Sequence, residues 1–126
     1  MRWFVDGMNV IGSRPTGWWH DRTGAMRELV AQLRAFAESS GEAVTVVFDG
    51  KPRELGEDPG PVEVVFAPGG RNAADDEIAR RVEEDDKPGE LCVVTSDGDL
   101  STRVRARGAK VVGAGGFRER LDAVGR

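Results

Sequence analysis

The stretch RWFVDGMN, residues 2–9, places a short apolar run directly before a carboxylate, a glycine and an amide. Such a run is typical of a strand that is buried on both faces. The pattern returns at residues 43–49, AVTVVFD, where a continuous apolar run again ends on an aspartate. It returns once more at residues 91–97, LCVVTSD. Each of three apolar runs therefore leads to an aspartate at its end.

Helical patterns separate these runs. Apolar residues recur at helical spacing from Met26 to Ala37, after Asp21, which can cap a helix, and before the break at Gly41. Apolar strands that alternate with helices indicate a Rossmann-like α/β fold. This is a three-layer sandwich with a central, mainly parallel sheet of about five strands. The expected strands are residues 2–6, 43–48, 62–66, 91–95 and 109–112. The expected helices follow Asp21, Asn72, Asp99 and Gly116.

Segments rich in glycine and proline are expected to connect these elements. They are residues 12–21, 50–61, 68–72 and 113–116. None of them is long enough to divide the chain, and no internal repeat is present. Residues 1–126 are therefore expected to form one domain.

The composition restricts the class of protein. Apolar residues make up 39% and charged residues 32% of the 126, as in globular proteins. No apolar run approaches the roughly 20 residues of a membrane helix, and no signal peptide is evident. The single cysteine, Cys92, excludes a disulfide framework or a cysteine zinc site within one chain. A cytoplasmic protein is expected, and a monomer and a dimer both stay open.

The net charge of −4 is unevenly distributed along the chain. Residues 54–99 hold 14 acidic and 4 basic side chains, whereas residues 103–126 hold 7 basic and 2 acidic ones. One explanation is a metal-binding cluster of carboxylates beside a surface that binds phosphate. The other is an ordinary distribution of solvated charges.

Several aspartates are expected to meet at one edge of the sheet. Parallel strands point their carboxyl ends toward the same edge, and ligand sites form where the connections there diverge. The candidates follow strands directly or begin the helix after the third strand: Asp6, Asp49, Asp75, Asp76, Asp97 and Asp99. Each could instead be a turn residue or a helix cap, for instance Asp99 before Leu100, but caps do not require this registry.

Gathered carboxylates repel one another unless a cation neutralises them. Oxygen ligands without paired histidines or thiols favour Mg²⁺ or Mn²⁺ over zinc. Such cations polarise a phosphate oxygen and lower the pKa of a bound water. The sequence therefore predicts phosphoryl chemistry at the acidic edge.

Four blocks of the sequence resemble the NYN domains of the PIN-like ribonuclease superfamily. They are Asp6-Gly7-Met8-Asn9-Val10-Ile11-Gly12, Val47-Phe48-Asp49-Gly50, Ala74-Asp75-Asp76-Glu77-Ile78 and Val94-Thr95-Ser96-Asp97-Gly98-Asp99. Their order and spacing are closest to the bacterial YacP-like branch, over nearly the whole chain. The resemblance implies a PIN-like fold and a metal-dependent RNA endonuclease. The chain departs from the branch at Met8, where an aromatic residue is usual.

The resemblance also implies roles for single residues. Asp6, Asp75 and Asp97 are the implied metal ligands, and Asp99 is a fourth. Asn9 is implied to orient a ligand or the backbone near the metal.

Other residues of the blocks are additional candidates. Thr95 and Ser96 are implied to steady the phosphate or the loop that carries Asp97. Asp75 is favoured over Asp76 because Ile78 follows it at the usual offset. Asp76 and Asp49 stay open as further ligands.

Contacts to RNA are expected from aromatic and basic side chains outside the blocks. Exposed tryptophans can stack on unpaired bases, at about 1–3 kcal/mol per base, and arginines can contact phosphates. The tryptophans could equally cover the first long helix. The candidates are Arg14, Trp18, Trp19, Arg71 and Arg103.

Three functions are compatible with these patterns. The leading one is an endoribonuclease that hydrolyses single-stranded or flexible RNA with Mg²⁺ or Mn²⁺. The alternative is a non-catalytic module of the same fold that binds RNA or the ribosome. A receiver domain also gathers acids at a parallel edge, but it ranks low because it expects a lysine after the fifth strand, and Lys110 begins that strand instead.

Overall fold

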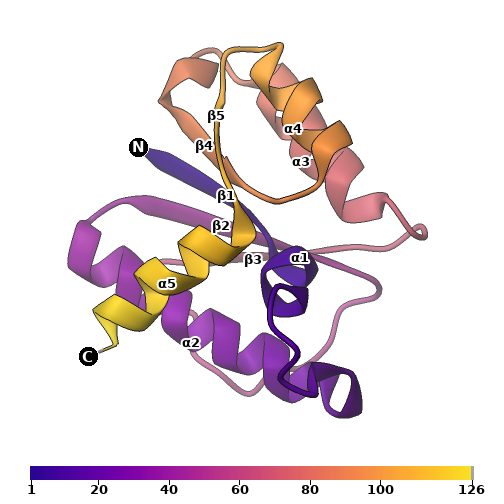
Figure 1. The fold of residues 1–126 in the computed structure, drawn as a ribbon, viewed down its shortest axis with the longest axis vertical. Helices are drawn as coiled ribbons and strands as arrows, with labels where there is room; N and C mark the ends of the chain where they lie inside the picture. The colour runs from indigo at the N-terminus through magenta and orange to yellow at the C-terminus, as the bar shows by residue number, and fades with distance from the viewer. Residues whose placement is uncertain (126) are drawn as a thin grey trace.

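A five-stranded parallel sheet forms the centre of the protein in a computed structural model that describes residues 1–125 (Figure 1). The strands lie in the order β3-β2-β1-β4-β5, and each neighbouring pair is parallel. Their bounds are β1 Arg2–Asp6, β2 Ala43–Asp49, β3 Glu63–Ala67, β4 Leu91–Val94 and β5 Lys110–Val112. Each expected strand is therefore present, within one residue at either end.

Helices cover both faces of the sheet (Figure 1). On one face lie α1 (Gly7–Gly12), α2 (Arg22–Ser40) and α5 (Ala114–Val124); on the other lie α3 (Ala73–Glu84) and α4 (Gly98–Arg105). Two short 3₁₀ turns, η1 (Trp18–His20) and η2 (Pro88–Glu90), lie in the connections. The expected α/β three-layer sandwich is confirmed, with a sheet that is entirely rather than mainly parallel.

Successive residues of the strands enter two separate cores. In β1, Trp3 and Val5 pack on the side of α1, α2 and α5, whereas Phe4 packs on the side of α3 and α4. In the inner strand β4, which lies between β1 and β5, all four residues are buried. A strand that is buried on both faces has no polar alternation, which is why the sequence shows continuous apolar runs.

The longest helix, α2, begins and ends as its sequence predicts. The Asp21 carboxylate accepts a hydrogen bond from the Gly24 amide at 2.9 Å and so caps the first turn. Gly41 follows the last turn with a φ of 71°, a left-handed conformation that glycine adopts without strain. None of the helices within residues 1–125 is long and apolar enough to span a membrane.

Two segments differ from the sequence-based expectation. The helix α1 was not expected, because its six residues are too few to show a helical period and include a glycine at each end. The expected loop at residues 113–116 is wrong, because Gly113 lies at the N-cap and residues 114–116 form the first turn of α5. Burial of Ala114, Phe117 and Leu121 outweighs the low helix propensity of the two glycines in that turn.

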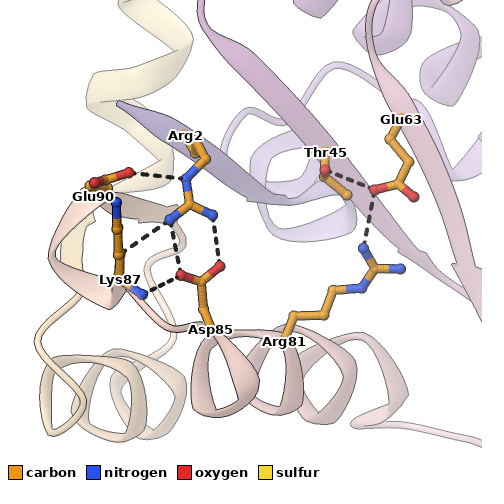
Figure 2. Close-up of polar contacts among 7 residues, drawn as sticks. All are labelled: Arg2, Thr45, Glu63, Arg81, Asp85, Lys87 and Glu90. Atoms are coloured by element: carbon orange, nitrogen blue, oxygen red, sulfur yellow. Dashed lines mark hydrogen bonds and ion pairs between the residues drawn. The ribbon is translucent and has the colours of Figure 1, made fainter.

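Ion pairs connect elements at the amino-terminal side of the sheet (Figure 2). Arg2 donates from Nη1 and Nη2 to the two carboxylate oxygens of Asp85 at 2.7 and 2.9 Å. These hydrogen bonds lower the pKa of Asp85 to about 2. In the same view, Arg81 of α3 donates to Glu63 of β3, which also accepts from Thr45 of β2. The contacts tie β1 to the connection before β4, and α3 to the edge of the sheet.

Gly7 lies where β1 passes directly into α1, against the side chain of Phe48. A Cβ atom at position 7 would lie 2.5 Å from two ring carbons of Phe48 and 3.1 Å from Val46 Cγ2. Phe48 is fully buried, so its ring cannot move without disturbing the core. Gly7 is not among the glycines with positive φ. Packing, and not backbone conformation, therefore requires glycine at this position.

The variant Gly7→Ala is expected to lower the free energy of unfolding by about 1–3 kcal/mol, because the added methyl group overpacks the core. Gly12→Ala is the matched control in the same helix, since its added Cβ would meet no atom within 4 Å apart from its chain neighbours and the backbone of its own helix. The control is expected to be neutral or to stabilise by up to about 1 kcal/mol. Chemical denaturation measures both values, and equal stabilities would contradict the packing argument.

Candidate active site

The candidate site lies where the strand order reverses. From β1 the chain proceeds to β2 and β3 on one side, and it returns to β4 and β5 on the other. Connections therefore diverge between the carboxyl ends of β1 and β4, which is where ligands bind in open parallel sheets. Asp6 ends β1, and Thr95, Ser96 and Asp97 follow β4 directly.

Asp6 is a buried carboxylate at this position, with only 4% of its surface exposed. The hydroxyl of Thr95 donates a hydrogen bond to Asp6 Oδ2 at 3.0 Å. The same hydroxyl oxygen accepts a hydrogen bond from the Asp97 amide at 3.1 Å. Thr95 thus links the end of β1 to the loop that carries Asp97.

Carboxylates from four separate segments line one hollow of about 290 Å³ beside Asp6. The lining residues are Asp6, Met8, Asn9, Asp49, Arg71, Asn72, Asp75 and Asp97. An adjoining hollow of about 270 Å³ shares Asp75 and Asp97 and adds Asp76, Asp99 and Arg103. The predicted meeting of distant aspartates at one edge of the sheet is therefore present in the structure.

The electrostatics of the hollow follow from this crowding. Burial, together with the charge of Asp75, raises the pKa of Asp6 to about 7, although the hydrogen bond from Thr95 opposes the rise. Burial and the charges of Asp97 and Asp49 also raise the pKa of Asp75. Both carboxyl groups are thus poorly compensated by positive charge.

Three side chains of the site accept hydrogen bonds from amides in the first turns of helices, and one of them, Asp97, is itself an N-cap. Asp49 Oδ1 accepts a hydrogen bond from the Ala74 amide of α3 at 2.9 Å. Asp97 Oδ1 accepts from the Leu100 amide of α4 at 2.8 Å, and Ser96 Oγ accepts from the Ala114 amide of α5 at 2.9 Å. The alternative in which Asp99 caps the helix from Leu100 is therefore wrong: the helix begins at Gly98 and Asp97 caps it.

Asn9 and Arg118 hold the neighbouring segments in place. Asn9 Oδ1 accepts a hydrogen bond from the Ser96 amide at 2.8 Å, so α1 positions the loop after β4. Arg118 of α5 donates to the carbonyl oxygens of Val10 and Ile11, at 2.9 and 3.3 Å, near the end of α1. Sequence reasoning missed Arg118, because nothing local connects it to residues more than 100 positions earlier.

The structure separates Asp75 from Asp76. Asp75 is partly buried and lines both hollows, whereas Asp76 is exposed and lines only the second. Asp76 Oδ1 accepts a hydrogen bond from Arg103 Nη1 at 3.0 Å. The geometry therefore favours Asp75 as the residue that faces Asp6.

A family model described as the YacP-like NYN domain matches residues 3–126. The chain belongs to the YacP-like NYN family. This family is one of PIN-like nucleases, as the four sequence blocks had indicated. No curated protein matches the chain.

Two solved structures have the same fold as this YacP-like chain. The crystal structure of Rae1 (YacP) from Bacillus subtilis aligns with a TM-score of 0.82 at 24% identity, over 100% of this chain and 76% of Rae1. A mutant of the same protein aligns with a TM-score of 0.80 at 23% identity, over 100% and 77%. At this identity the likeness establishes the fold alone.

The candidate RNA contacts of this YacP-like protein differ in their surroundings. Arg71 is exposed and lines the hollow beside Asp6. Trp19 is 52% exposed, whereas Trp18 is partly buried against the core and lies under Arg22. Two of the other arginines are paired, Arg14 with Asp122 and Arg103 with Asp76. A role in RNA binding stays a prediction for each of them.

The hollow suits a hard, partly hydrated divalent cation. Its acidic donors are carboxylate oxygens, and the raised pKa of Asp6 and of Asp75 indicates a need for positive charge. Among residues 1–125, no three His, Cys, Asp or Glu side chains are already arranged to hold a metal ion. Mg²⁺ retains several waters and uses one or two direct carboxylates, so the donor set fits it without such a cage.

Metal-free protein is expected to lose stability as the pH rises from about 4 to about 7. The folded state keeps Asp6 protonated in this window, because its pKa is raised from 3.8 to about 7, whereas the unfolded chain has already released that proton. The expected loss is a few kcal/mol. Asp6→Asn should remove most of this pH dependence, because an amide does not titrate. It should also raise the stability at pH 8, because Asn carries no charge and keeps an acceptor for Thr95.

Thermal denaturation in EDTA across this pH range measures the effect. Asp86→Asn is the control, because Asp86 is an exposed carboxylate outside the hollow, and this variant should keep the wild-type profile. Identical profiles for wild type and Asp6→Asn would contradict the electrostatic account of the site.

Proposed function

We propose that this YacP-like protein is an endoribonuclease that hydrolyses RNA phosphodiester bonds at the acidic hollow, with Mg²⁺ or Mn²⁺ as its cofactor. The observation that carries the proposal is the meeting of Asp6, Asp75 and Asp97 in one hollow at the point where the strand order reverses. Membership of a family of PIN-like nucleases supports it.

Asp6, Asp75 and Asp97 would hold the cation, and Asp99 in the adjoining hollow is the fourth candidate. When bound, the cation supplies Lewis-acid polarisation of the phosphodiester and a lower pKa for the attacking water. Asp97 uses Oδ1 to cap α4, so its carboxylate is held in a fixed orientation from the helix.

Neutral side chains keep these carboxylates in position. The Thr95 hydroxyl fixes the orientation of Asp6, and it also binds the backbone at Asp97. Asn9 holds the Ser96 amide and thereby keeps the loop after β4 close to α1. Removing either hydrogen bond would loosen the acids relative to one another without changing the charge of the site.

The proposed substrate is flexible, unpaired RNA in the cytoplasm. Arg71 in the wall of the hollow would contact a phosphate next to the cleaved bond. Trp19 offers the more exposed of the two adjacent indole rings, and an unpaired base could stack on it. Arg14, Trp18 and Arg103 are engaged within the protein and are weaker candidates.

Asp97→Asn is expected to reduce metal-dependent RNA cleavage by about a hundredfold or more, because it removes a charged ligand at the reacting phosphate. Asparagine also caps helices, so α4 and the fold should persist. Cleavage of unpaired RNA with and without Mn²⁺ measures the effect, with Asp86→Asn as the control. Full activity of Asp97→Asn, or wild-type activity in excess EDTA, would overturn the mechanism. RNA binding without cleavage under any divalent cation would favour a non-catalytic RNA-binding module.

The pair Asp75→Asn and Asp76→Asn tests which adjacent acid serves the site. Asp75→Asn is expected to lose cleavage as Asp97→Asn does, because Asp75 faces Asp6. Asp76→Asn removes only an exposed ion pair with Arg103 and is expected to change the rate by about twofold or less. Measured kcat and KM for both variants under one metal concentration decide the assignment. A larger loss of cleavage rate in Asp76→Asn than in Asp75→Asn would reverse the assignment.

A further inference from the structure

A second hollow, of about 710 Å³, lies away from the acidic residues, along β5 and near the amino end of β1. This β5 cleft is lined by residues of several elements, among them Trp3, Glu42, Arg105, Lys110, Val112 and Arg120. Trp3 and Asp6 are three residues apart in one strand, which separates their backbones by about 10 Å. The β5 cleft is therefore a different surface from the candidate active site.

The β5 cleft concentrates positive charge in a protein whose net charge is −4. Arg105, Lys110 and Arg120 are all exposed, and within residues 1–125 none of the three forms an ion pair with a carboxylate. By contrast, Arg34, Arg80 and Arg103 each pair with an acid. The cations of the cleft are thus available to an external anion.

The remaining lining gives the cleft a shaped wall. Glu42 is the single carboxylate among the lining residues, and it lies 2.9 Å from the Met1 ammonium. The guanidinium of Arg120 lies over the ring of Trp3, 5.6 Å from its centroid, so its orientation is restrained by the indole. Trp3 Nε1 is buried without a hydrogen-bond partner among the described residues. The wall is therefore apolar and cationic, and the unpaired Nε1–H of Trp3 lies behind it.

The backbone of β5 leads from this cleft toward the acidic site. Val112 lines the β5 cleft, and only Gly113 separates it from Ala114 and Gly115, which line a third hollow. The third hollow also contains Met8 and Asn9, and both of these residues line the acidic hollow as well. Along the chain, Gly113 therefore links the β5 cleft to the third hollow, which shares two residues with the acidic hollow.

We propose that the β5 cleft binds the phosphate backbone of the RNA strand that occupies the acidic site, a few nucleotides away from the cleaved bond. The inference rests on the proposed function for the identity of the strand, and it adds a second point of attachment. Contacts to phosphates position a strand without reading its sequence. The cleft therefore favours long unpaired substrates over short ones, whatever their base composition.

The double variant Arg105→Gln with Lys110→Gln tests the proposal, because both side chains are exposed and outside the acidic site. Lys87→Gln with Arg107→Gln is the control, since it removes the same charge from exposed residues outside the cleft. Binding of labelled unpaired RNA is measured in EDTA over a range of salt concentrations, with circular dichroism as a check of folding. Cleavage of a long RNA and of a dinucleotide is measured separately with Mn²⁺.

The cleft variant is expected to bind long RNA about tenfold or more weakly at about 50 mM salt, and to lower the salt slope by about 1.4, or 0.7 for each lost contact. It should raise KM for the long RNA and leave dinucleotide cleavage unchanged. Equal losses in the cleft variant and the control would overturn the proposal, as would no loss in either. So would the absence of RNA binding to wild-type protein in EDTA, even if cleavage with Mn²⁺ persists. Binding that depends on the cleft but never leads to cleavage would support the cleft and refute the nuclease function.

Discussion

The arrangement at the edge of the sheet depends on one buried carboxylate, that of Asp6 at the end of the central strand β1. Transfer of a charged group from water into a protein interior costs several kcal/mol unless partners compensate it. The partners of Asp6 are neutral groups, the hydroxyl of Thr95 and the backbone at Asn9, while its charged neighbours Asp75 and Asp49 have the same sign. The two apolar cores on either side of β1 supply the packing that holds this unfavourable group in place.

Helix ends offset part of this cost. The helices α1, α3, α4 and α5 each begin close to the carboxyl edge of the sheet, and the amino end of a helix carries partial positive charge. In three of these helices a first-turn amide donates to a side chain of the site, so the residues that hold the helix ends and the candidate ligands are partly the same. In the hydrogen bonds described above, Asp49 and Asp97 each use Oδ1. The second oxygen of each carboxylate can therefore serve a ligand while the first holds the helix.

The sequence was sufficient to predict the sheet and the meeting of the acids, because long apolar runs between helices have few other solutions. Finer features depend on tertiary contacts and could not be read from the chain. Residues 7–12 are too short for a helical period, and the glycines of α5 resemble a loop until the burial of Phe117 is known. Asp75 and Asp76 differ by about 100° around the helix axis, and the packing of α3 decides which one faces Asp6. The link from Arg118 to α1 joins distant parts of the chain and leaves no local pattern.

The last helix has a consequence for the order in which the protein matures. Arg118 donates a hydrogen bond to the end of α1, and the Ala114 amide donates one to Ser96. The helix α5 therefore contacts the segments that follow both β1 and β4. During synthesis the aspartates of the site emerge before α5 does. A nascent chain that has not yet exposed α5 therefore carries the aspartates but lacks these contacts to the end of α1 and to Ser96. The surroundings of the candidate site are therefore complete only when α5 packs against α1 and the loop after β4.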